Sequence, residues 1–125
     1  MKFTHTPAPN YSVWGQVDQT EEIAAGIWRV HTPSHGGLIV SPERLAAMPD
    51  ALKCNVYSKG NPHAFEEDLE CCLVALAFPD AFDMDQVDDA EQSIMHSGET
   101  YEGAAKWVVD NWIEHRAKAF KKEDG

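Results

Sequence analysis

The chain has 125 residues, of which 43% are hydrophobic and 10% aromatic, and its net charge at pH 7 is −11. This composition excludes a disordered protein, and the lack of an apolar run of roughly 18 residues or of an apolar leader predicts a cytoplasmic protein without a membrane span. Since a chain of this length buries roughly two-thirds of its unfolded surface, we predict one domain over residues 1–125, with a loose arm at about residues 1–10.

The N-terminal half carries strand patterns. Residues 11–14 predict a short strand, and the alternating run at residues 27–32 predicts a longer one. A second apolar run, at residues 38–40, follows a glycine-containing loop, so the two runs predict an antiparallel hairpin. Gly36 and Gly37 are expected to supply the positive φ angles of this loop.

Helix patterns follow the hairpin. Ser41 is a suitable N-cap, Pro42 fits the first helical position, and Pro49 ends this short helix. A longer helix is predicted from Asn61 to Pro79, because five residues at helical spacing form one apolar face: Phe65, Leu69, Cys72, Leu73 and Leu76.

The C-terminal third is also predicted to be helical. Residues 80–90 form a polar connector in which helical turns are an open alternative. A short helix follows near residues 90–96, and a final helix spans about residues 100–122. The final helix carries an apolar stripe of Tyr101, Ala105, Val108, Val109, Trp112 and Phe120. Strands that precede helices indicate an α+β fold, in which a small antiparallel sheet has the C-terminal helices packed on one side.

Two groups of polar residues are candidates for chemistry. His31 and His35 bracket the hairpin loop, and residues 66–68 are a carboxylate triplet. Two histidines and a carboxylate are a known metal arrangement, and a hydrolase would use His35 with Glu67 and Asp68. The sequence contains no nucleophile elbow, phosphate-binding loop or CxxC pair. We therefore expect no metal and no cofactor, and we treat catalysis as an alternative.

The same carboxylates have a structural interpretation. Arg44 lies in the helix after the hairpin, and the triplet begins the next predicted helix. A bidentate contact between an arginine and a carboxylate would join the two helices. We predict this structural junction for Arg44 with Glu66, Glu67 and Asp68.

The negative charge is concentrated in one segment. Residues 60–105 contain twelve acids and no Lys or Arg. Nucleic-acid binding depends on basic residues that displace counterions from phosphate, so we expect no direct contact with nucleic acid. The acids form either a solvated surface or a contact with a protein partner that has a basic surface. We predict that the contact is made by Asp80, Asp83, Asp85, Asp88, Asp89 and Glu91.

Four short motifs carry a resemblance to a known family. They are Thr-Pro-Ser-His-Gly-Gly at residues 32–37, Ser-Pro-Glu-Arg at 41–44, Glu-Glu-Asp at 66–68 and Ala-Phe-Pro at 77–79. Together they resemble a domain family of unknown function that is encoded on phages, plasmids and other mobile elements. The resemblance covers about residues 14–84 and implies no activity, so the motif residues form a candidate site only.

Size, charge and the implied origin favour an inhibitor. We expect a small acidic protein that binds a host defence complex in the cytoplasm, of the anti-CRISPR or anti-restriction type, with a nucleic-acid-binding nuclease as the partner. A hydrolase built from His35 and the triplet, or a non-inhibitory accessory protein of phage replication, stays open, as does the oligomeric state. A pocket around the motif residues would favour the hydrolase.

Overall fold

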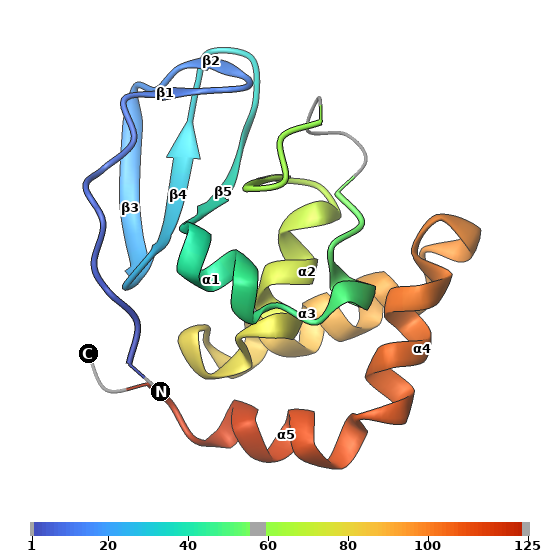
Figure 1. Cartoon of the computed structure of the whole chain (residues 1–125). Helices are drawn as coiled ribbons and strands as arrows, with labels where there is room; N and C mark the ends of the chain where they lie inside the picture. The colour runs from blue at the N-terminus through green and yellow to red at the C-terminus, as the bar shows by residue number, and fades with distance from the viewer. Residues whose placement is uncertain (1, 56–59, 124–125) are drawn as a thin grey trace. The chain divides into compact units, whose positions relative to one another are not determined.

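The computed structural model describes residues 2–55 and 60–123 (Figure 1). The chain divides into two compact units. Unit 1 comprises Met1–Ala47 and Asn55–Cys71, and unit 2 comprises Met48–Cys54 and Cys72–Gly125. Unit 1 contains the strands, and unit 2 contains most of the helical residues, so the predicted α+β class is confirmed.

Unit 1 is built on antiparallel strands. A four-stranded sheet has the order β3-β4-β5-β6, and a separate two-stranded ribbon pairs β1 with β2. The predicted hairpin is confirmed as β4 and β5, which lie side by side in Figure 1. The strand bounds are Tyr11–Ser12 (β1), Gly15–Gln16 (β2), Gln19–Ala24 (β3), Ile27–His31 (β4), Gly36–Val40 (β5) and Ala64–Glu66 (β6).

The two faces of this sheet bury different residues. The cross-strand pairs Val30–Gly37 and Gly37–Glu66 place three residues on one face. Trp14 packs against Val30 on this face. The opposite face carries the buried side chains of Ile27, Leu38, Val40 and Phe65. The strand pattern at residues 27–32 therefore has buried side chains on both faces.

A helix follows β5, as its cap predicts. Helix α1 spans Pro42–Ala47, and the Ser41 hydroxyl accepts a hydrogen bond from the Arg44 N–H at 3.1 Å. The N-terminal arm has no regular secondary structure, but it is attached to unit 1. The Thr4 N–H donates to Glu43 Oε1 at 2.7 Å, and the Trp28 indole donates to the Thr6 hydroxyl at 3.1 Å.

The helix predicted from Asn61 to Pro79 is wrong in its first half. Residues Ala64–Glu66 form strand β6, and helix α2 spans only Glu70–Ala77. Phe65 pairs with Leu38 of β5 and is fully buried there. A single buried apolar residue such as Phe65 is compatible with a strand as well as with a helix. The backbone of β5 offers hydrogen bonds to residues 64–66, and the spacing of apolar residues in the sequence does not reveal this pairing.

Unit 2 is helical in its described part. The predicted helical turns within residues 80–90 belong to a longer helix than expected, because α3 begins at Met84 and continues to Met95. Asp83 and Gln86 form a capping box in which the Asp83 N–H donates to Gln86 Oε1 at 3.0 Å. The remaining elements are η1 (Asp50–Leu52), η2 (Pro79–Ala81), α3 (Met84–Met95), η3 (Gly98–Tyr101), α4 (Glu102–Asp110) and α5 (Trp112–Phe120).

The predicted final helix is divided in two. Asn111 separates α4 from α5, and its side-chain amide donates to the Trp107 carbonyl at 2.9 Å. Such a side-chain bond competes with helical backbone geometry. The predicted apolar stripe is buried only in part: Tyr101 and Val108 are buried, whereas Val109, Trp112 and Phe120 are exposed. None of the helices in the described residues is both long and apolar enough to cross a membrane.

Candidate functional site

Strand pairing brings the two main sequence motifs together. Gly37 of the Thr-Pro-Ser-His-Gly-Gly motif pairs with Glu66 of the carboxylate triplet. The Glu67 N–H extends this contact by donating to the Gly36 carbonyl at 3.0 Å. The motifs therefore meet along the β5–β6 edge within unit 1, and the triplet does not begin a helix as predicted.

Gly36 and Gly37 lie where neighbouring atoms leave no space for a side chain. A Cβ on Gly37 would lie 2.3 Å from the Phe65 carbonyl oxygen and 2.6 Å from Trp14 Cη2. A Cβ on Gly36 would lie 2.7 Å from Glu67 Oε2. Neither glycine has a positive φ, so the predicted turn role is wrong. These residues are strand positions at which another backbone, an indole ring and a carboxylate come too close for a side chain.

Three predicted site residues also influence one another electrostatically. Glu66 is half-buried, and its burial, which removes water from the carboxylate, raises the pKa. Asp68 raises the pKa further through its charge and a side-chain hydrogen bond, whereas nearby His35 lowers it. Burial and Asp68 thus favour the protonated form of Glu66, whereas the side chains of His35, Glu67 and Asp68 are exposed.

We expect Glu66→Gln to change the pH dependence of stability. A carboxyl group whose pKa is raised by folding stabilises the protein when protonated, and this contribution is lost as the pH rises through the raised pKa. The variant should therefore be more stable than the wild type at pH 7, and the difference should vanish below the ordinary value of 4.5. Urea unfolding at several pH values measures this, and a constant difference across that range would contradict it.

Arg44 makes contacts with two other parts of unit 1. Its side chain is fully buried, its Nε donates to the Ala25 carbonyl at 2.8 Å, and its guanidinium lies 3.7 Å from the centre of the Phe3 ring. Arg44 therefore holds α1 to the β3–β4 turn and to the N-terminal arm. Its pairing with Glu66, Glu67 or Asp68 stays a prediction.

The six acids predicted to bind a partner have different environments. Asp83, Asp85 and Asp89 are exposed. Asp88 is exposed but lies 2.8 Å from Arg116 Nη1, and the half-buried Asp80 lies 4.0 Å from Lys118 Nζ. These bases come from α5, far from the acids in the sequence, so local charge counting could not find the ion pairs.

Glu91 differs from the expectation, because it is buried. Its carboxylate lies 2.7 Å from His115 Nε2 and 3.0 Å from Arg116 Nη1. Each of these contacts joins α3 to α5 inside unit 2, so Glu91 is a structural residue and not a surface carboxylate. Sequence reasoning overlooked His115, whose only signal is its spacing of four residues from buried Ala119.

The arrangement in the described residues does not suggest a metal centre. No group of three or more histidine, cysteine or carboxylate side chains there is placed to hold an ion. His31 forms a separate exposed pair, in which its Nδ1 lies 2.8 Å from Asp18 Oδ1. The two-histidine arrangement considered from the sequence is therefore not assembled among these residues.

Comparison with known proteins identifies the family. No curated protein and no solved structure matches the chain. A family model matches residues 7–124, which is more than the resemblance in the motifs covers. The chain belongs to the family described as "Domain of unknown function (DUF7007)".

Proposed function

We propose that this chain is a binding protein that holds a basic protein surface with the exposed carboxylates near the start of α3. The observation that carries the proposal is the environment of Asp83, Asp85 and Asp89. Among the residues that the structure describes, no basic group lies within 4.0 Å of these three carboxylates. Unneutralised carboxylates on one helix attract a basic partner and steer its approach.

The internal contacts of unit 2 support this role, because they hold the helix in place. The capping box fixes the first turn of α3, and the buried Glu91 fixes its middle through His115 and Arg116. A charged surface on an anchored helix loses less conformational entropy on binding than one on a loop. The buried carboxylate of Glu91 thus helps to hold the exposed carboxylates of α3 in position.

The partner class follows from charge and from the resemblance to proteins of mobile elements. We propose a nucleic-acid-binding nuclease of a host defence system, whose channel of Lys and Arg would accept carboxylates in place of phosphates. The chain would act as an inhibitor of the anti-CRISPR or anti-restriction type in the host cytoplasm. The absence of Lys and Arg from residues 60–105 supports this partner over nucleic acid itself.

A titration tests the proposal. The wild-type chain is used to capture a partner from host lysate, and binding is then measured at low and high salt. Replacing Asp83, Asp85 and Asp89 by Asn should weaken binding about tenfold at low salt, since each exposed charge contributes a few tenths of a kcal/mol or more. The difference should shrink at high salt because the charges are screened.

The matched control uses other exposed acids of the same segment. Glu99→Gln/Glu102→Gln removes two charges outside α3, and binding should change by less than about twofold. Asn is also an effective N-cap, so the Asp83 substitution leaves the start of α3 intact. Equal losses from both variants, or binding that is insensitive to salt, would contradict a specific acidic surface.

A second candidate function is a hydrolase. It is favoured by one observation: His35 lies close enough to Glu66 to lower the pKa of that carboxyl group, which burial and Asp68 raise. A histidine beside a carboxyl group with a raised pKa is an acid–base arrangement. Turnover of activated esters that disappears in a folded His35→Ala variant would support this function, and activity unaffected by that substitution would exclude a role for His35.

A further inference from the structure

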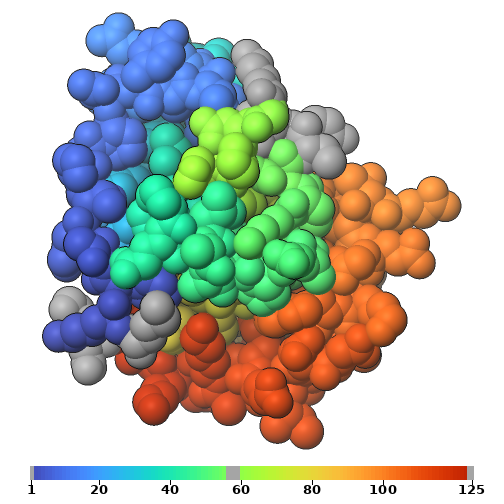
Figure 2. All heavy atoms as spheres, in the orientation of Figure 1, coloured from blue at the N-terminus to red at the C-terminus, as the bar shows by residue number. Residues whose placement is uncertain are grey.

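The outer side of α4 and α5 carries large apolar side chains in contact with water. Ile113 is 83% exposed, Phe120 70%, Val109 57% and Trp112 45%. Val109 precedes the helical break at Asn111 and the other three follow it, while His115 and Ala119 occupy the buried side of α5. Adjacent apolar side chains on a surface of this kind mark sites of protein interaction. The side chains of α4 and α5 form the orange and red part of the surface in Figure 2.

Arg116 joins this apolar row to the acids of α3. Its guanidinium carbon lies 5.6 Å from the ring centres of both Trp112 and Phe120. Its Nη1 lies 2.8 Å from Asp88. The aromatic pair and the acidic helix therefore border one another within unit 2. We call the combined region the acid–aromatic surface: Asp85, Asp88, Asp89, Val109, Trp112, Ile113 and Phe120.

We propose that the acid–aromatic surface binds a basic amphipathic helix of a partner protein. This inference rests on the proposed function and adds the chemistry of the partner. The partner helix would carry an apolar stripe that contacts α5, and Lys or Arg residues on the side that faces α3. Trp112 and Phe120 are eight residues apart and span about 12 Å, or about two helical turns. A partner helix with apolar residues at intervals of three and four would match that row.

Charge complementarity selects the basic flank. Asp85 and Asp89 are exposed on α3 next to the Asp88–Arg116 pair. Two lysines of the C-terminal end are held by backbone carbonyls that precede α3, because Lys118 donates to the Ala77 carbonyl and Lys122 to the Phe82 carbonyl. A basic helix thus meets carboxylates along one side of the apolar row, and an acidic helix or an anionic membrane is repelled there.

Three synthetic peptides of about 18 residues, long enough to form helix on binding, probe the surface. One is an amphipathic Leu/Lys peptide, the second replaces Lys by Glu, and the third replaces Leu by Ser. The Leu/Lys peptide should bind the full chain at least about tenfold more tightly than either of the others. Fluorescence of Trp112, compared with that of a Trp112→Phe variant, reports whether the peptide reaches this surface.

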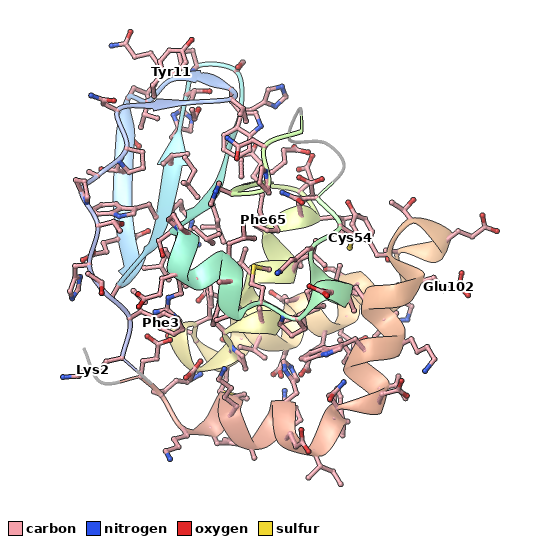
Figure 3. The ribbon with its side chains drawn as sticks, viewed as in Figure 1. Lys2, Phe3, Tyr11, Cys54, Phe65 and Glu102 are labelled. Atoms are coloured by element: carbon pink, nitrogen blue, oxygen red, sulfur yellow. The ribbon has the colours of Figure 1, made fainter. Side chains whose placement is uncertain are left out.

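Two variants divide the surface into its parts. Ile113→Ser/Phe120→Ser should weaken binding of the Leu/Lys peptide about tenfold or more, since these side chains are the most exposed of the row. Asp85→Asn/Asp89→Asn should weaken it a fewfold, and more at low salt. The matched control is Tyr11→Ser, because Tyr11 is 71% exposed at the β1–β2 end of unit 1 (Figure 3). It should leave peptide binding unchanged.

Other outcomes overturn the inference in distinguishable ways. If the Ser/Lys peptide binds as well as the Leu/Lys peptide and only the Asp variant weakens it, the acids bind a basic partner without the apolar row, and the proposed function alone stands. If no basic peptide binds, and if the captured partner binds the Asp variant as tightly as the wild type, both proposals fail. If sedimentation shows a wild-type dimer that Ile113→Ser/Phe120→Ser dissociates, a second copy of the chain covers the row.

Discussion

Gly37→Ala is expected to lower the free energy of unfolding by about 3 kcal/mol, the upper part of the range for overpacking a well-packed core. The added Cβ would lie 2.3 Å from the Phe65 carbonyl oxygen and 2.6 Å from Trp14 Cη2. Backbone cannot move there without separating β5 from β6, which is the contact that unites the two motifs. Urea unfolding followed by circular dichroism measures the loss.

Two other glycines serve as controls for Gly37. Gly36→Ala should cost less, because the nearest atom to its Cβ is the flexible end of Glu67. Gly103→Ala should stabilise the protein by about 0.5 kcal/mol, since this glycine lies in α4 with nothing within 4 Å and alanine favours a helix. Equal stability of the Gly37 and Gly103 variants would show that the close approach at β5 is not a constraint.

Glu91→Ala is expected to lower the free energy of unfolding by about 3 kcal/mol, a typical cost of breaking a buried ion pair. The substitution removes the side-chain partner of His115 and one of the two carboxylates to which Arg116 donates, the other being Asp88. His115 is fully buried, and its Nδ1 already has no hydrogen-bond partner among the described residues, so its ring would be left without any side-chain hydrogen bond there. Chemical denaturation at pH 7 measures the effect.

An acid of the same helix provides the matched comparison. Asp89→Ala removes an exposed carboxylate from α3 and should change stability by no more than about 0.5 kcal/mol. The two variants therefore separate the structural acid from the surface acids that the proposed function uses. A Glu91 variant as stable as the Asp89 variant would show that the contact between α3 and α5 contributes little.

Much of the secondary structure follows from local patterns. The β4–β5 hairpin and the Ser41 cap of α1 are confirmed, because alternation and capping involve residues that are neighbours in the sequence. The strand at Ala64–Glu66 could not be predicted in this way. Phe65 pairs with Leu38, 27 residues earlier, and that pairing exists only once β5 is in place.

The candidate site shows the same limit. The motifs contain the residues of the candidate site, but the arrangement of these residues depends on the register in which β5 pairs with β6. The acids of residues 80–91 also look equivalent in the sequence. Arg116 and His115 approach from α5 and make Glu91 a buried structural residue, while Asp85 and Asp89 stay on the surface.

Composition and local periodicity thus suffice for the α+β class, the hairpin, the cap of α1 and the acidic character of residues 60–105. The packing decided the roles of individual side chains. Trp112 and Phe120, which follow the helical break at Asn111, are exposed on the surface. Contacts between helices that are distant in the sequence neutralise some carboxylates and leave others charged. Burial and ion pairing are properties of neighbours in space, and for these residues the neighbours lie more than twenty positions away in the chain.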